Sequence, residues 1–447
     1  MVDLPEQVSK LVQRLHNTNK VVEFCVAYSG GMDSHVLLQS ISVVSLHFPL
    51  IKLRAVHINH GLSSDANIWA KHCADICRKL AIEINIISVK VHLKSGESPE
   101  ALAREARYGA FRSILRAHEC LLTAQHQDDQ AETLLLQLLR GSGPQGLASM
   151  PEFAPFAGGY IARPLLTLTR EQIFEYAQEQ NLSWVEDASN KELSYSRNYL
   201  RHEVIPLIKK RWPAFSKTVS RSAQLCAEAQ HIIEIDSHAG MQDVLLDKQT
   251  LSVSALNAID EIKRKNIVRY WIKELRLPGP TQAGMQQIIN SVINASRTAT
   301  PLVAWPGCEI RRYQDRLYAM PPLKKHTADL EISWDFNSSI QSPIFGKLSV
   351  KSLKGNGVKN IVAQSENVKI VFRQGGETYC EYEKVGTRPL KKLFQELAIP
   401  PWLRGRIPLI YFDNHLVAIA DFVVCSKYKA NSQELGFEII WEPAWSY

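Results

Sequence analysis

The sequence predicts an α/β protein whose N-terminal part is a doubly wound parallel sheet. The chain has 447 residues, which suggests roughly two to four folding units. Hydrophobic residues make up 45% and charged residues 22%, proportions typical of globular proteins with ordinary cores. In the first two hundred residues, short apolar runs alternate with helical stretches. This alternation is typical of a parallel sheet covered by helices.

The elements of this first part alternate regularly along the chain. We expect strands at 21–28, 53–58, 82–89 and 120–124, and helices at 34–44, 65–80, 99–117 and 128–139. In doubly wound sheets, ligands bind beyond the carboxyl ends of the strands. The polar residues that follow each strand are therefore the first candidates for a functional site.

After residue 215 the predicted secondary structure becomes mainly helical and then mainly β. Long amphipathic helices are expected at 216–235, 257–275 and 281–295, followed by short alternating segments at 310–318, 368–373 and 416–424 and one helix at 389–397. This pattern predicts a helical domain followed by a small β-rich α+β domain. The predicted domains are the α/β domain at 1–215, the helical domain at 216–322 and the C-terminal domain at 361–447, with a linker over 323–360.

Composition excludes several classes of protein. None of the eight cysteines forms a Cys-x-x-Cys pair, which argues against zinc ribbons, iron–sulfur clusters and thioredoxin motifs and favours reduced thiols. No apolar run approaches the ~18 residues that a membrane span requires, and no targeting signal is visible at the start. We therefore expect a cytoplasmic protein without a membrane partner. The net charge of +7 permits an anionic macromolecular partner.

The most informative motif is a six-residue loop, Ser29-Gly30-Gly31-Met32-Asp33-Ser34. It lies between a predicted strand and a predicted helix. Its two glycines let the backbone approach an anion closely, and its N–H groups, hydroxyls and helix dipole suit phosphate oxygens. No Gly-Lys-Ser/Thr follows, so this is not the P-loop pattern. The loop resembles that of the PP-loop ATP pyrophosphatases, which split ATP between its α and β phosphates; the resemblance implies that Asp33 holds Mg²⁺ or positions the attacking group.

The ends of two other predicted strands carry further polar residues. His57 follows the second strand, and the segment from His126 to Thr133 follows the fourth. On a helix that starts near His126, positions 126, 129, 132 and 133 share about a third of the circumference, while Asp128 points elsewhere. His126, Asp129 and Glu132 are therefore expected to face one site. Such a concentration of negative charge suits a cationic substrate or a second metal.

Later motifs narrow the family. A glycine-rich loop spans 140–147, followed by Arg163-Pro164-Leu165-Leu166, by 184–190 and by 196–201. In this order, the motifs resemble those of the tRNA(Ile)-lysidine synthases, and the resemblance extends to the C-terminal domain. It implies a PP-loop ATPase fold, similar to the adenine nucleotide alpha hydrolases, in the catalytic domain at 1–215, substrate or tRNA binding at 216–322, and tRNA binding at 361–447.

The resemblance also implies an activity. Such enzymes bind tRNA(Ile) with the anticodon CAU and use ATP to adenylate the C2 oxygen of the wobble cytidine. The ε-amine of L-lysine then attacks C2 and expels AMP. The product, lysidine, changes codon reading from AUG to AUA.

Each candidate residue receives an expected role from this resemblance. The catalytic group comprises Asp33, His126 and Asp129, and the lysine-binding group comprises Asp129, Glu132 and Arg197. The expected ATP contacts are Ser29, Gly30, Gly31, Met32, Asp33, Ser34, His57, Arg107 and Gly141. Arg163 and Arg201 are further candidates for the lysine carboxylate or RNA phosphates. Either a carboxylate or His126 accepts the proton of the attacking amine.

The expected tRNA contacts are Arg104 and Arg201 in the catalytic domain and a basic cluster around an aromatic residue in the C-terminal domain. The members of this cluster are Arg388, Lys391, Lys392, Trp402, Arg404 and Arg406. Lysine and arginine neutralise phosphates, and an exposed aromatic ring stacks on a splayed base. A second cluster, Lys263-Arg264-Lys265 with Arg269, lies in the predicted helical domain.

Three alternatives stay open at this point. A 2-thiocytidine synthetase also adenylates a base carbonyl, but it needs cysteines that handle sulfur. A glutamine-dependent amidation enzyme needs a glutaminase half, and none is recognisable here. A non-catalytic RNA-binding protein would retain only the nucleotide pocket. The sequence leaves a homodimer open.

Overall fold

The computed structural model describes residues 3–59, 61, 63, 65–89, 99–187, 190, 192–296, 299–324, 329–336, 338–363, 367–380 and 386–444. The chain divides into two compact units, Met1–Ile232 and Ile233–Tyr447. The division falls inside the long helix α10 (Phe215–Val244). None of the helices in these described ranges is both long and apolar enough to span a membrane.

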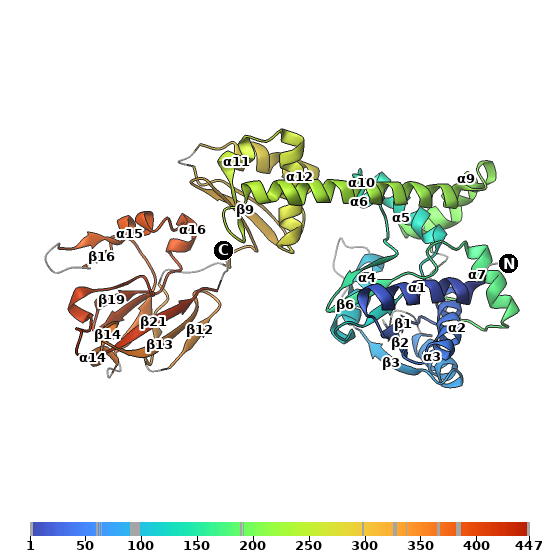
Figure 1. Cartoon of the computed structure of the whole chain (residues 1–447), viewed down its shortest axis with the longest axis horizontal. Helices are drawn as coiled ribbons and strands as arrows, with labels where there is room; N and C mark the ends of the chain where they lie inside the picture. The colour runs from blue at the N-terminus through green and yellow to red at the C-terminus, as the bar shows by residue number, and fades with distance from the viewer. Residues whose placement is uncertain are drawn as a thin grey trace. The chain divides into compact units, whose positions relative to one another are not determined.

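A six-stranded sheet forms the centre of the first unit (Figure 1), in the order β3-β2-β1-β4-β6-β5. The pairs β1–β2, β1–β4, β2–β3 and β4–β6 are parallel, and β5–β6 is antiparallel. The strands are β1 (Glu23–Ala27), β2 (Lys52–Asn59), β3 (Glu83–Ser88), β4 (Cys120–Leu122), β5 (Phe153–Phe156) and β6 (Gly159–Ala162). The four predicted strands are therefore confirmed.

The helices of the first unit also include those that the sequence predicts. They are α1 (Leu4–Asn19), α2 (Met32–His47), α3 (Ala66–Lys79), α4 (Pro99–Ile114), α5 (Gln127–Leu139), α6 (Pro144–Leu147), α7 (Arg170–Glu179), α8 (Ser196–Tyr199), the π-helix η2 (Leu200–Val204) and α9 (Ile205–Arg211). Helix α1 is not among the predicted elements, although its buried residues recur at helical spacing. These residues are Leu4, Val8, Leu11, Val12 and Leu15.

The first unit has two hydrophobic cores, one on each face of the sheet, because side chains alternate along the strands. In β1, Phe24 and Val26 pack into the core shared with α1, α2, α3 and α7. Cys25 points to the opposite face, where it packs with Phe111 of α4. Successive side chains of a strand point to opposite faces, so helices on both faces bury the parallel strands. The predicted doubly wound sheet is confirmed.

The strand order determines where a ligand site forms. It reverses between β1 and β4, which lie side by side although β2 and β3 separate them in the chain. Loops that leave the carboxyl ends of such neighbouring strands border a crevice. The loop after β1 and the segment after β4 therefore meet at one edge of the sheet.

The second unit begins with helices and a small antiparallel sheet. Beside α10, these elements are α11 (Val253–Asn257), α12 (Glu261–Glu274), α13 (Gln282–Gln287), the π-helix η3 (Ile288–Ile293), β7 (Thr250–Ser252), β8 (Leu302–Trp305), β9 (Cys308–Tyr313) and β10 (Arg316–Met320). The sheet has the order β7-β10-β9-β8. The predicted helices are confirmed, and this sheet completes their core with Cys308, Ile310 and Leu317.

The C-terminal part of the second unit is β-rich, as predicted. Its strands are β11 (Ile332–Ser333), β12 (Ile340–Ser342), β13 (Gly346–Lys354), β14 (Val358–Lys359), β15 (Val368–Val371), β16 (Thr378–Tyr379), β17 (Arg388–Pro389), β18 (Leu409–Phe412), β19 (His415–Ile419), β20 (Val423–Val424) and β21 (Leu435–Glu442). Its helices are α14 (Asn360–Ala363), α15 (Leu390–Glu396), α16 (Pro401–Arg404) and the 3₁₀-helix η4 (Ser426–Tyr428). The sheets run β11-β15-β18-β19-β20, β12-β13-β21-β14 and β16-β17.

The predicted linker over 323–360 is wrong. Strand β13 lies within it and pairs along its whole length with β21. Phe336, Phe345 and Leu348 from the same stretch are buried in the core of the C-terminal domain. The sequence does not reveal this strand, because its side chains after Leu348 are partly or fully exposed and give no clear apolar alternation. Its partner β21 also lies far along the chain.

Candidate active site

The loop after β1 forms a tight turn that its own hydroxyls stabilise. The Oγ atoms of Ser29 and Ser34 lie 2.9 Å apart, and the Ser34 hydroxyl also donates to the carbonyl of Gly31 at 2.9 Å. Gly30 has a φ of 87°, and a Cβ there would lie 2.9 Å from Val185 Cγ2 and 3.1 Å from Cys73 Sγ. Helix α2 begins directly after Gly31, which supplies no side-chain cap for the first amides of the helix. The predicted strand-to-helix turn is therefore present, with a helix N-terminus that suits an anion.

Asp33 lies in the first turn of α2. Its side chain is 36% exposed, but its Oδ1 atom is buried and has no hydrogen-bond partner among the described residues. Burial raises the pKa of Asp33, although nearby His126 acts in the opposite direction. A buried carboxylate oxygen without a partner is costly, and a cation would supply the missing interaction.

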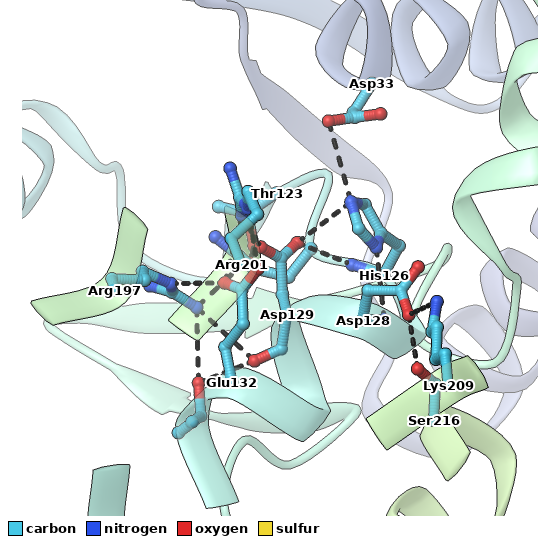
Figure 2. Close-up of polar contacts among 12 residues, drawn as sticks. Asp33, Thr123, His126, Asp128, Asp129, Glu132, Arg197, Arg201, Lys209 and Ser216 are labelled. Atoms are coloured by element: carbon cyan, nitrogen blue, oxygen red, sulfur yellow. Dashed lines mark hydrogen bonds and ion pairs between the residues drawn. The ribbon is translucent and has the colours of Figure 1, made fainter. Parts of the chain in front are cut away.

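His126 caps helix α5 and points toward two carboxylates (Figure 2). Its Nδ1 atom accepts the backbone N–H of Asp128 at 3.2 Å. Its Nε2 atom lies 3.7 Å from Asp33 Oδ2 and 3.4 Å from Asp129 Oδ2. Because Nδ1 accepts a hydrogen bond, a neutral His126 carries its proton on Nε2. The ring therefore presents an N–H group to both carboxylates.

Asp129 completes the cap of the same helix. Its Oδ2 atom accepts the backbone N–H of His126 at 3.0 Å, and the two residues together form a reciprocal capping box. Burial acts to raise the pKa of Asp129, but the charges of His126, Arg197 and Arg201 outweigh it and lower the pKa. Asp129 is therefore held as a carboxylate beside Asp33.

Two arginines from the segment after α7 bind the acidic face of α5. Arg197 of α8 donates from Nε to Glu132 Oε2 at 2.7 Å, and Arg201 of η2 donates from Nε to Glu132 Oε1 at 2.6 Å. Arg201 also reaches Asp129 Oδ1 at 2.9 Å. The Glu132 side chain is only 1% exposed. Asp33, His126, Asp129, Glu132, Arg197 and Arg201 thus form one connected cluster (Figure 2).

Asp128 points away from this cluster, as the helical spacing predicts. Its Oδ1 atom accepts from Lys209 Nζ of α9 at 2.7 Å and from the hydroxyl of Ser216 at the start of α10. Burial acts to raise the pKa of Asp128, but these two hydrogen bonds outweigh it and lower the pKa. Sequence reasoning did not identify Lys209 and Ser216, because nothing local in the sequence links them to α5.

Several predicted site residues lie elsewhere in the first unit. Gly141 follows the C-terminal end of α5, a helix of 13 residues. It therefore lies about 20 Å along the helix from His126. Arg104 and Arg107 are exposed on α4, and the Arg104 guanidinium lies 4.8 Å from the centre of the Tyr108 ring. The cluster does not include these three residues.

Two further candidates are buried. The Nδ1 atom of His57 lies 3.0 Å from the carbonyl oxygen of Tyr28 and 3.4 Å from Cys73 Sγ, beneath the loop that follows β1. Arg163 donates from Nη1 to the carbonyl of Pro151 at 2.6 Å, and burial lowers its pKa. Both side chains are therefore engaged in contacts within the protein.

The predicted tRNA contacts of the second unit fall into two groups. Arg388, Lys391 and Lys392 lie at or beside α15, where both lysines are exposed. Arg404 and Arg406 are buried, with 9% and 8% of their surfaces exposed, and Trp402 is half-buried. Lys391 and Lys392 therefore have the exposure that RNA phosphates require, whereas Arg388 is partly buried and pairs with Glu396 at 2.5 Å.

The basic cluster on α12 is largely engaged in contacts within the protein. Lys263 pairs with Asp236 at 2.8 Å and Lys265 with Glu261 at 2.5 Å. Arg264 donates to the carbonyl of Ile259 at 2.9 Å. These contacts reduce the positive charge that the cluster offers to RNA.

No group of three or more histidine, cysteine or acidic side chains within the described ranges is arranged to hold a metal ion. Mg²⁺ usually keeps several waters and binds through one or two carboxylates together with substrate phosphates. Asp33 belongs to the loop from Ser29 to Ser34, here called the phosphate loop, and one of its oxygens has no partner among the described residues, so it fits that mode of binding. None of the eight cysteines is in a disulfide.

Comparisons with known proteins agree with this arrangement. Residues 4–208 match the PP-loop domain, residues 251–318 the TilS substrate binding domain, and residues 368–441 the TilS substrate C-terminal domain. The tRNA(Ile)-lysidine synthase of Coxiella burnetii is 40% identical over 440 residues, which cover 98% of this chain and 97% of that protein. Those of Proteus mirabilis and Photobacterium profundum are 39% and 38% identical, over 92% and 94% of this chain and 93% and 95% of theirs. From the sheet, the phosphate loop and these similarities together, it follows that the chain belongs to the tRNA(Ile)-lysidine synthase family.

Proposed function

We propose that this protein uses ATP to join L-lysine to C2 of the wobble cytidine of tRNA(Ile) with a CAU anticodon. The main support is the position of the acidic cluster on α5 beside the phosphate loop, since His126 Nε2 lies within 3.7 Å of both Asp33 and Asp129. One site thus combines a place for a triphosphate with a place for a cationic substrate.

In the first step, the cytidine C2 oxygen attacks the α-phosphate of ATP. A bond forms between this oxygen and the α-phosphorus, and pyrophosphate leaves. The loop from Ser29 to Ser34 holds the phosphates with backbone N–H groups and the N-terminus of α2. The closely packed Gly30 keeps the loop in the conformation that this contact needs.

Mg²⁺ is the cation that fits the phosphate site. Asp33 would hold it through the oxygen that lacks a partner within the described part of the chain. The ion would neutralise charge on the triphosphate. It would also favour the ionised form of Asp33, whose pKa is raised by burial.

In the second step, the ε-amine of lysine attacks C2, and AMP leaves with the C2 oxygen. Asp129 is the acceptor for the lysine ammonium, with Glu132 and Arg197 as the rest of the lysine site. Both Glu132 oxygens accept hydrogen bonds from arginines and its side chain is 1% exposed, whereas Asp129 is 14% exposed. We therefore assign Glu132 the role of orienting Arg197 and Arg201, and Arg197 the role of binding the lysine carboxylate.

The attacking amine must lose one proton, and a carboxylate is the better acceptor. The Nε2 atom of a neutral His126 already carries a proton, because Asp128 N–H occupies Nδ1. Asp33 and Asp129 both face that N–H group. We therefore assign His126 the role of orienting the two carboxylates.

Incubation with unmodified tRNA(Ile), ATP, Mg²⁺ and labelled lysine tests the proposal. We expect one lysine per tRNA at the wobble position, with stoichiometric release of pyrophosphate and AMP. Pyrophosphate release that does not depend on tRNA, or label that does not reach the tRNA, would contradict it. Tight tRNA binding without either product would instead support a non-catalytic RNA-binding protein.

A 2-thiocytidine synthetase is the second candidate, and the cysteines argue against it. Burial raises the pKa of Cys25, Cys73, Cys77 and Cys120 to about 12. A thiol must ionise to act as a nucleophile, so burial makes these four thiols poor nucleophiles. A homodimer also stays a prediction, for which sedimentation of the full chain is the appropriate measurement.

A further inference from the structure

The region around Trp402 has the composition of an RNA-binding surface, but it is packed against the sheet of the preceding domain. Arg404 of α16 donates from Nη2 to the Tyr313 hydroxyl at 2.9 Å, and its guanidinium lies 5.6 Å from the centre of the Tyr313 ring. Both residues belong to the second unit. The contact therefore joins the domain of α10–α13 and β7–β10 to the C-terminal domain.

Trp402 lies at the centre of this contact. The Arg311 guanidinium lies 5.2 Å from the centre of the Trp402 ring, a cation–π geometry. The rings of Tyr318 and Tyr313 meet Trp402 edge-on, with centroid distances of 5.3 and 6.4 Å. Edge-to-face rings at these distances attract each other. Arg311, Tyr313 and Tyr318 therefore all stabilise the position of the indole ring.

The alternation of β9 explains why these side chains share one surface. Cys308 and Ile310 point into the core of their own domain. Glu309, Arg311 and Tyr313 alternate with these core positions and point the other way, and Arg311 lies directly opposite Tyr318 in the β9–β10 pair. Side chains opposite each other in a strand pair lie on the same face. Glu309, Arg311, Tyr313 and Tyr318 therefore form one outward face of this sheet.

The charges of this contact are satisfied within the protein. Glu309 accepts two hydrogen bonds from Arg311, at 2.9 and 3.3 Å. Arg404 also donates from Nε to the carbonyl of Ile399 at 2.8 Å, and Arg406 donates to the carbonyl of Lys324. Burial lowers the pKa of Arg406, although Glu309 counteracts it. Arg404 and Arg406 are both hydrogen-bonded in this way and buried, so phosphate oxygens have little access to them.

We propose that Trp402, Arg404 and Arg406 form an internal clasp that fixes the C-terminal domain to the face of β9 and β10. In this assignment the three residues position the tRNA-binding surface without touching RNA. The exposed Lys391 and Lys392 on α15 are then the cations of this region that meet phosphates. The clasp rests on contacts within the second unit alone, whereas its effect on tRNA rests on the proposed function.

Arginine labelling of the full chain without RNA tests the clasp directly. A dicarbonyl reagent is applied, and peptide mass spectrometry measures the rate at each arginine. We expect Arg404 and Arg406 to react at least about tenfold more slowly than Arg276, an exposed arginine of the same unit, because burial excludes the reagent. Trp402→Leu should abolish this protection, and Trp402→Phe, which keeps a ring under Arg311, should retain most of it. Equal rates at Arg404 and Arg276 in the unmodified protein, with protection appearing only after tRNA is added, would overturn the proposal.

Salt dependence of tRNA binding distinguishes positioning from phosphate contact. For Arg404→Met we expect weaker binding with an unchanged slope of log K against log salt, because the same phosphates are neutralised. For the double variant Lys391→Met with Lys392→Met we expect the slope to flatten by about 1 to 2, since each phosphate contact contributes roughly 0.7–0.9. A flatter slope for Arg404→Met would identify it as an RNA contact and reject the clasp. If the unmodified protein does not modify tRNA(Ile), the proposed function fails, whereas the RNA-free labelling still decides the clasp.

Discussion

Arg201 binds Glu132 through two hydrogen bonds, from Nε to Oε1 at 2.6 Å and from Nη2 to Oε2 at 2.9 Å. The same guanidinium reaches Asp129 one helical turn away at 2.9 Å. Burial acts to lower the pKa of Arg201, but the two carboxylates outweigh it and raise the pKa. The geometry of the acidic face of α5 therefore depends on a segment about 70 residues further along the chain.

Glu132→Gln should destabilise the first unit. The change removes a carboxylate that is 1% exposed and leaves Arg197 and Arg201 with a weaker acceptor. Breaking a buried pair in this way costs several kcal/mol, and because both arginines are partly exposed we expect about 2–3 kcal/mol. Denaturant unfolding measures the loss. Glu171→Gln, at an exposed position of α7, is the matched control and should change stability by less than about 0.5 kcal/mol.

Asp128→Asn should change how stability depends on pH. The folded-state pKa of Asp128 lies below the ordinary value of 3.8, so the native state binds fewer protons there than the unfolded state. Its stabilisation is complete above the unfolded pKa and disappears as the pH falls through the folded pKa. Wild type should therefore exceed the variant in stability near pH 7, and the difference should shrink below about pH 4. A difference that stays constant from pH 7 to pH 2 would contradict this reasoning.

The two glycines of the phosphate loop should respond differently to alanine. Gly30 has a φ of 87° and tight neighbours, whereas the nearest atom to a Cβ at Gly31 lies 3.6 Å away. Left-handed backbone costs a side-chain-bearing residue about 1–2 kcal/mol, and the clash adds to this. Gly30→Ala should therefore lose both stability and ATP affinity, while Gly31→Ala should keep nearly full stability. Thermal unfolding and nucleotide titration measure the two effects separately.

Asp33→Asn should block the first chemical step. The variant retains the size of the side chain but loses the negative charge that we assign to Mg²⁺. We expect tRNA-dependent pyrophosphate release to fall by roughly 100-fold or more, a typical loss for one electrostatic group in an active site. Far-ultraviolet circular dichroism checks that the fold survives. Normal pyrophosphate release with no change in its Mg²⁺ dependence would remove Asp33 from the metal site.

Asp129→Asn should separate the two chemical steps. An amide still accepts the backbone N–H of His126, so the helix cap persists, but the charge that attracts the lysine ammonium is lost. We expect lysine incorporation to fall by roughly 100-fold while tRNA-dependent pyrophosphate release persists. Parallel assays of the two products measure the split. Equal losses in both assays would assign Asp129 to adenylation.

Local features of the sequence were sufficient to predict the site's main elements. The phosphate loop from Ser29 to Ser34 is contiguous, and its place between a strand and a helix follows from the apolar pattern. His126, Asp129 and Glu132 share a face because of helical periodicity alone. The parallel sheet follows from alternating strands and helices, so its strands are confirmed within a few residues. These features arise from residues that are close together in the chain, so the local sequence pattern is enough to predict them.

Only the tertiary structure shows which side chains from distant segments contact one another. Arg197 and Arg201 are bound to the acids of α5, and Arg404 is buried against Tyr313, whereas Lys391 is exposed. In the sequence, Arg404 and Lys391 are equally good candidates for RNA contacts, because charge and spacing do not reveal which side chain is buried. Strand β13 was missed for the same reason, since its pairing with β21 spans most of the C-terminal domain. Burial and pairing across such distances arise from packing of the whole chain, which local patterns do not record.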